Sequence, residues 1–195
     1  MTDANNIFRL NNVEFDIESA TLLAGVYPLP DEDTSEFIWI LDVNMARREL
    51  NGQNCRPRLY HEEIVLPARR LEDLAGQTLF LNMEEEYPEY ALYVFQHCAI
   101  YGSHLRFIDV DGRNVRIEWR GLSDARGPDT PFYMHARAEF KEIQVKGNEN
   151  DTEETMRARL EEHFDTADYM VRLMEVSKDV GPDGLRDAYC YFTHR

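Results

Sequence analysis

The sequence predicts an α+β fold, with a mostly antiparallel β-sheet or open barrel and one long C-terminal amphipathic helix packed on it. Three observations support this fold class. Apolar and polar residues alternate along much of residues 1–147, as they do in half-buried strands. The dipeptide Asp111-Gly112 favours a tight hairpin. After Gly147 the apolar residues recur every three or four positions, as on one face of a helix.

The N-terminal part of the chain predicts strands. Residues 7–27 read as two short strands, because Val13, Phe15 and Ile17 alternate with acidic residues. The stretch 28–33 contains two prolines and three acids and ends that pattern. Residues 37–41 form a continuous apolar run rich in β-forming side chains, which favours a buried strand.

The middle of the chain predicts further strands separated by turns. Residues 51–57 read as a turn and residues 59–66 as a strand. Residues 71–76 read as a single helical turn closed by glycine, and 77–83 return to strand.

The hairpin centred on Asp111-Gly112 fixes a predicted register. If these two residues form the turn, the cross-strand pairs are Val110 with Arg113, Ile108 with Val115, Arg106 with Ile117 and His104 with Trp119. One sheet face then carries Ile108, Val115, Ile117 and Trp119, and we expect that face to meet the core.

Residues 132–145 predict a strand in which the apolar positions change from even to odd residue numbers. Alternate residues from 132 to 140 are apolar, namely Phe132, Met134, Ala136, Ala138 and Phe140. Ile143 and Val145 fall on the opposite parity, and a bulge near Glu142 would reconcile the two patterns.

The C-terminal region predicts a helix over residues 151–178. Its apolar stripe consists of Met156, Leu160, Phe164, Ala167, Val171 and Met174. Asp151 is the expected N-cap, with Glu154 completing a capping box. Two glycines and a proline in residues 180–184 end the helix, and 185–195 read as a short strand or tail.

Length and composition favour one soluble domain over residues 1–195. A chain of 195 residues that is 43 % apolar suits a single core. Neither the first residues nor any later run has the composition of a signal peptide or a membrane span. The three cysteines are widely spaced and odd in number, which suits a reducing compartment. These features predict a cytoplasmic protein.

The charge is strongly negative. There are 37 acids and 21 bases, which give a net charge of −16. Such a field repels nucleic acid and anionic lipid and attracts basic surfaces. The charge is also segregated along the chain, since residues 10–46 and 71–105 contain no Lys or Arg. We therefore expect a basic protein partner, and neither a nucleic acid nor a membrane.

Two acidic stretches are the candidate binding loops. The first contains Asp31, Glu32, Asp33 and Glu36. The second, residues 84–90, also carries tyrosines, which commonly serve as contact anchors in interfaces. The predicted partner-binding residues are Glu84, Glu85, Glu86, Tyr87, Glu89 and Tyr90.

Histidines supply the candidates for catalysis. An enzyme would group His61, Glu63, His97 and His135 around a cleft in the sheet. Their spacing matches no metal or catalytic motif, and residues 61 and 62 of a strand point to opposite faces. No glycine-rich nucleotide loop occurs in the sequence. We expect no metal and no cofactor.

Three hypotheses for function follow. The first is a non-catalytic acidic interaction protein that binds a basic protein, for instance a bacterial inhibitor or immunity-type protein. The second is a hydrolase-like or metal-dependent enzyme that uses the His/Glu cluster, and the third is a β-barrel that binds a small ligand. A helix stripe left exposed would also allow a homodimer through the C-terminal helix.

Overall fold

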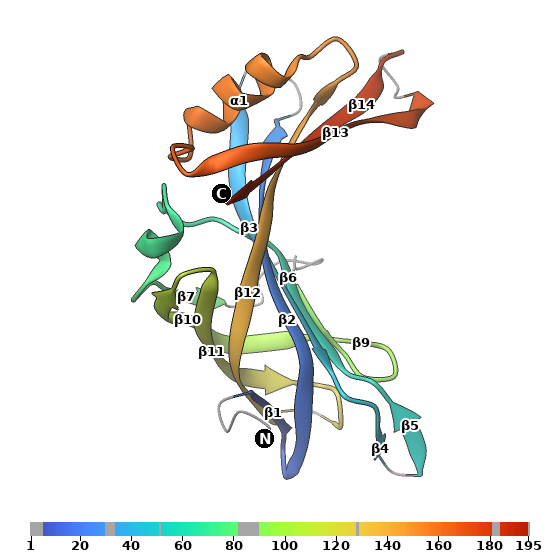
Figure 1. Ribbon diagram of the computed structural model, residues 1–195. Helices are drawn as coiled ribbons and strands as arrows, with labels where there is room; N and C mark the ends of the chain where they lie inside the picture. The colour runs from blue at the N-terminus through green and yellow to red at the C-terminus, as the bar shows by residue number, and fades with distance from the viewer. Residues whose placement is uncertain are drawn as a thin grey trace. The chain divides into compact units, whose positions relative to one another are not determined.

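The computed structural model describes residues 6–29, 34–50, 52–81, 90–127, 129–180 and 184–194 (Figure 1). One α-helix lies in this part of the chain, α1 (Glu153–Glu161), together with a 3-10 turn, η1 (Leu71–Leu74). The strands are β1 (Ile7–Leu10), β2 (Val13–Pro28), β3 (Ser35–Met45), β4 (Arg48–Leu50), β5 (Gln53–Cys55), β6 (Arg58–Ile64), β7 (Thr78–Leu81), β8 (Tyr90–Tyr93), β9 (His97–Cys98), β10 (Ile100–Asp111), β11 (Asn114–Ser123), β12 (Thr130–Asn148), β13 (Tyr169–Val180) and β14 (Arg186–His194).

The predicted α+β class with a long C-terminal helix is wrong. Strands take up 67 % of the described residues and helical turns only 8 %, so this part of the chain is mostly β. Helix α1 ends at Glu161, and much of the stretch predicted as its continuation forms β13. The antiparallel sheet is confirmed, because β10 with β11, β11 with β12, and β13 with β14 all pair antiparallel.

The described residues form two compact units, each assembled from separate parts of the chain. Unit 1 draws on residues 1–22, 40–64 and 71–140. Unit 2 draws on residues 23–39, 65–70 and 141–195. Strands β2, β3 and β12 contribute residues to both units. One domain over residues 1–195 stays a prediction.

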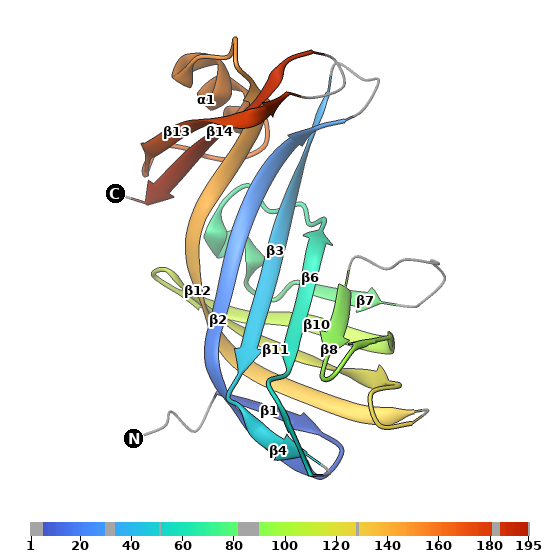
Figure 2. The ribbon, with the colours of Figure 1, turned by 90° about the vertical axis from the view of Figure 1, so that its right-hand side faces the viewer.

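Strand pairing in the sheet follows the order β7-β10-β11-β12-β1-β2-β3-β6-β8-β9 (Figure 2). The strands predicted in the first 66 residues are present as β1, β2, β3 and β6. The single helical turn is also confirmed as η1, with Gly76 just beyond it at φ 83°, where glycine is favoured. The predicted turn at 51–57 is in part a small hairpin of β4 and β5.

The β10–β11 hairpin has a different register from the one predicted. Asp111 pairs with Asn114, so the turn consists of Gly112 and Arg113. The register shifts between Phe107 and Asp109, so that Phe107 rather than Arg106 opposes Ile117. This irregularity places Ile108 outside the fully buried face and puts Phe107 on it, contrary to the prediction.

The predicted burial of the β11 face is confirmed. Val115, Ile117 and Trp119 are 0 % exposed. The indole Nε1 of Trp119 donates a hydrogen bond to Ser103 Oγ at 3.2 Å, which satisfies its one polar atom in the core. On β12 the predicted alternating set from Phe132 to Phe140 is also buried. Burial on β12 changes parity between residues 140 and 143, as the pattern predicted.

Helix α1 begins one residue later than predicted. Thr152 is the N-cap: its hydroxyl accepts a hydrogen bond from Thr155 N–H, and Thr152 N–H donates to the Thr155 hydroxyl. Asp151 instead accepts from Asn148 N–H at 2.8 Å, within the preceding turn. The capping box therefore uses Thr152 and Thr155 in place of Asp151 and Glu154.

Strand β13 occupies most of the second half of the predicted helix. It pairs with β14 from Tyr169 opposite His194 to Val180 opposite Arg186. The strand carries exposed apolar side chains, since Met170, Leu173, Val176 and Val180 are 37–63 % exposed. Residues 169–180 are therefore not part of a helix, and the homodimer predicted through the C-terminal helix stays a prediction. Of the two alternatives predicted for residues 185–195, a short strand or a tail, the structure has the strand, β14.

The structure also bears on the three cysteines and on membrane-spanning helices. Cys55, Cys98 and Cys190 are buried and form no disulfide. Among the described residues, no helix has the length and apolar composition needed to cross a membrane.

A matched pair of substitutions tests the burial of side chains in α1 and β13. Leu160 in α1 is 0 % exposed, whereas Leu173 in β13 is 37 % exposed. Leu160→Ala should therefore lower the free energy of unfolding by about 2–5 kcal/mol, and Leu173→Ala by less than about 1 kcal/mol. Denaturant unfolding measures both. Equal losses would contradict the placement of Leu160 in the core and of Leu173 on an exposed position of β13.

Candidate functional site

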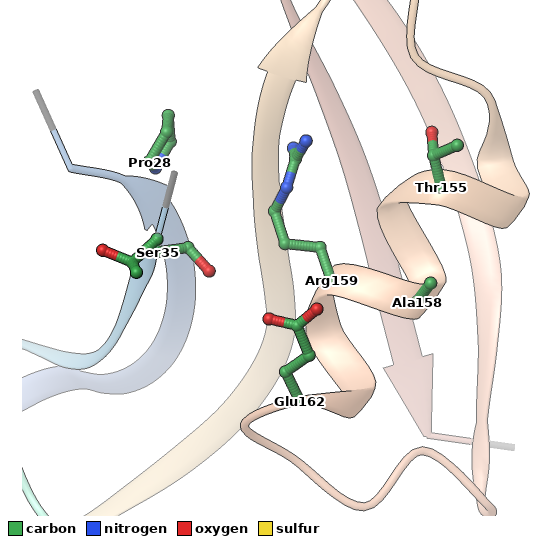
Figure 3. A pocket seen from close by; sticks show the side chains of 7 residues that line it. Pro28, Ser35, Thr155, Ala158, Arg159 and Glu162 are labelled. Carbon is green, nitrogen blue, oxygen red and sulfur yellow. The ribbon is translucent and has the colours of Figure 1, made fainter. Parts of the chain in front are cut away.

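A pocket of about 450 Å³ lies along one face of α1 in unit 2 (Figure 3). The helix buries Met156 and Leu160 on its other side. The pocket wall on α1 consists of side chains spaced by three and four residues, namely Thr155, Ala158, Arg159 and Glu162. Opposite them lie Pro28 at the end of β2 and Thr34 and Ser35 at the start of β3.

A second pocket of about 410 Å³ shares Ser35 and Glu162 with the first. Its other walls are largely apolar, with Leu29, Phe37 and residues 65–68 among them. Glu36, Arg69 and His163 add polar groups. The two pockets therefore meet at one hydroxyl and one carboxylate.

The cations that line the pockets are held by groups of unit 2. One guanidinium nitrogen of Arg159 donates to the carbonyl of Lys146 at 2.8 Å, and another lies 3.5 Å from a carboxylate oxygen of Asp151. Arg69 donates to the last carbonyls of α1, those of Glu161 at 3.0 Å and Glu162 at 3.2 Å. These bonds fix both guanidinium groups to the fold.

Ser35 and His163 form a hydrogen-bonded pair at the junction of the pockets. Ser35 Oγ lies 2.9 Å from His163 Nε2, and the tautomer of the ring decides which atom donates. The imidazole stacks on Phe37, with ring centroids 6.4 Å apart and planes inclined by 16°. A hydroxyl has one donor and two acceptor positions, so Ser35 can accept a further hydrogen bond.

The surface around the pockets is acidic. We define the α1 acidic surface as six exposed carboxylates, Glu153, Glu154, Glu161, Glu162, Asp165 and Asp168. None of the six forms an ion pair with any residue that the structure describes. Hydrogen bonds from the backbone and from Thr152 lower the pKa of Glu154, which favours its charged form.

The predicted acidic loops fall mostly outside the described residues. Asp31 to Asp33 and Glu84 to Glu89 are not among them. Tyr90 is described and is 7 % exposed, with its ring 5.1 Å from that of His61. Tyr90 therefore belongs to the core of unit 1, and its predicted part in partner binding stays a prediction.

The structure does not bring the four predicted catalytic residues into one cluster. His61 is buried against Tyr90 and Trp119, whereas His97 is on the other face of the β6–β8–β9 pairing and lies 3.1 Å from Tyr60 Oη. His135 pairs with Glu118, on the opposite face from Trp119. Glu63 is exposed, and its backbone N–H donates a hydrogen bond to His61 Nδ1 at 3.3 Å. No group of three potential metal ligands occurs among the described residues.

Sequence reasoning missed the residues that line the pockets. Ser35 and His163 are 128 positions apart and belong to no motif. Glu162 lies inside the helix predicted over residues 151–178, and the apolar pattern gave no sign that α1 ends there. The one available signal was the density of acids after residue 150, which predicts a solvated face equally well.

Comparison of the chain with protein-family profiles, curated proteins and solved structures found no match.

His61 predicts a pH dependence of stability. Burial lowers its pKa from 6.5 to about 4. Its Nδ1 accepts from Glu63 N–H, and its Nε2 has no partner among the described residues. Between pH 6.5 and 4 the unfolded chain binds more protons than the folded one, so stability falls as the pH is lowered. The loss attributable to His61 is about 2 kcal/mol between pH 7 and pH 5.

Urea unfolding at the two pH values measures this effect. His61→Leu should remove the His61 share of the loss, because leucine does not titrate and needs no hydrogen bond. His97→Gln, at an exposed histidine of the same sheet, is the control and should keep the wild-type pH dependence. The burial argument fails if His61→Leu and the wild type lose stability equally.

Proposed function

We propose that the protein is a non-catalytic interaction protein whose α1 acidic surface binds a basic protein partner. The observation that carries this proposal is the position of Glu161 and Glu162. Both lie in the last turn or at the C-cap of α1, where the helix dipole disfavours negative charge. Their placement is thus unfavourable for the helix itself.

Negative charge placed against the helix dipole suggests that Glu161 and Glu162 serve a purpose beyond the stability of α1. Local rules are most often broken at functional sites, where another part of the structure compensates. Arg69 supplies that compensation here, since its guanidinium binds the carbonyls of both glutamates. The four acids at the end of α1 and in the following turn therefore remain exposed without unwinding the helix.

The net charge of −16 extends the reach of this surface. A field of one sign accelerates the encounter with a partner of the opposite sign and discourages partners of the same sign. Three separate buried cysteines suit a reducing compartment, so a cytoplasmic location belongs to the same proposal. An inhibitor or immunity-type protein is one class with this behaviour.

A charge-matched pair of triple variants tests the proposal. The first variant combines Glu161→Gln, Glu162→Gln and Asp168→Asn. The control combines Glu49→Gln, Glu62→Gln and Glu72→Gln, three exposed acids of unit 1, and changes the net charge equally. The melting temperature of the α1 variant should be unchanged or slightly higher, because two charges that oppose the helix dipole are removed.

Capture from lysate of the source cells, followed by kinetics with the purified captured protein, measures binding. A basic protein should be retained by the wild type and by the control but lost from the α1 variant. The association rate constant at low salt should fall roughly tenfold in the α1 variant alone, with a weaker dependence on salt. Equal retention by the two variants would contradict the proposal, because their net charges are the same.

A further inference from the structure

We propose that the two pockets meeting at Ser35 and Glu162 receive a basic side chain, arginine in the first instance, from the partner. This inference rests on the proposed function and adds the chemistry of the contact. The α1 acidic surface accounts for attraction at long range, whereas a specific complex also needs a short-range contact. The pockets supply that contact.

The charge balance of the pocket walls favours a cation. Arg159 and Arg69 line the pockets, but both guanidinium groups are bound to carbonyls or carboxylates of unit 2. Glu162 and Glu36 form no ion pair with residues in the described ranges. Arg159 is paired with Asp151, whereas the carbonyls that Arg69 binds are neutral and do not cancel its charge. Glu162, Glu36 and Arg69 together therefore leave the pocket walls with one net negative charge. Figure 3 shows the Glu162 side chain projecting from α1 toward the side on which Ser35 lies.

The polar groups at the junction match the donors of a guanidinium. Glu162 accepts through two carboxylate oxygens, the geometry in which arginine forms paired hydrogen bonds. Ser35 Oγ is bonded to His163 Nε2 at 2.9 Å and keeps acceptor capacity for a further N–H. The stacking of His163 on Phe37 holds the imidazole, and with it the Ser35 hydroxyl, in place.

The apolar walls suit the hydrocarbon part of a basic side chain. Leu66, Pro67 and Phe37 line the second pocket, and Pro28 and Ala158 line the first. Long basic side chains bury their methylene groups on such surfaces while the charged group bonds to polar atoms. Volumes of about 450 and 410 Å³ lie within the range of roughly 300–1,000 Å³ found for ligand pockets. They leave room for the flanking peptide.

NMR titration with short peptides tests the inference. The probes are acetylated pentapeptides Gly-Gly-X-Gly-Gly in which X is arginine, lysine or citrulline, the neutral counterpart of arginine. We expect the arginine peptide to shift the amide signals of Ser35, Glu162 and His163. The citrulline peptide should cause no shift there. Weaker shifts with lysine would support recognition of the planar guanidinium, and stronger shifts with lysine would overturn the choice of arginine.

Substitutions then separate the pocket from the general charge. Glu162→Gln should weaken binding of the arginine peptide about tenfold, since it removes one charged partner. Glu154→Gln is the matched control, because Glu154 is an exposed acid of the same helix that lines neither pocket. Ser35→Ala should weaken binding less than Glu162→Gln. Equal weakening by Glu162→Gln and Glu154→Gln would overturn the pocket.

Failure of this inference differs from failure of the proposed function. If the arginine peptide shifts only signals outside the pockets, or none, the pocket assignment is wrong. The captured partner would still depend on the α1 acidic surface in the experiment with the two triple variants. If that dependence is absent, the proposed function is wrong, whatever the peptides do.

Discussion

The junction between Arg69 and the end of α1 is the contact on which unit 2 depends. The last carbonyls of a helix have no partners inside it. Arg69 donates to two of them, and its own carbonyl accepts from Asp165 N–H at 2.8 Å. These bonds join residues 65–70 to the turn that follows the helix. Both segments line the second pocket, so the interaction that ends α1 also shapes the candidate site.

An aromatic cluster then directs the chain from helix to strand. Phe164 lies 5.4 Å from Phe37, 5.9 Å from Trp39 and 5.3 Å from Tyr169, measured between ring centroids. Phe164 is thus fixed in a turn beyond α1, and Tyr169 is the first residue of β13. Anchored in this way, the chain pairs with β14 instead of adding helical turns. The same contacts hold His163 beside Ser35.

The sequence predicted the features of the fold that depend on local interactions and missed those that depend on tertiary contacts. Alternation identified the strands and the buried face of β11, because it reports which side of a strand meets the core. It could not locate the irregularity near Ile108, which depends on the partner strand. The stripe from Met156 to Met174 misled for a similar reason, since its spacing fits a helix while β14 supplies the pairing that makes a strand. Ser35 and His163 meet only through tertiary packing.

The carboxylates at the end of α1 are not required for the hydrogen bonds that end the helix. A neutral helix end would accept the Arg69 hydrogen bonds equally well, because the carbonyls that receive them belong to the backbone. The guanidinium charge offsets the repulsion between the helix dipole and the nearby carboxylates, and so makes an acidic end tolerable without requiring one. The Glu161 carboxylate accepts a hydrogen bond from the buried Thr166 hydroxyl at 2.9 Å, which a glutamine could also accept. The negative charge of Glu161 and Glu162 is thus not required by these contacts. On the proposed function, distant charge governs how fast a partner arrives, and the Ser35 and Glu162 pockets govern how long it stays.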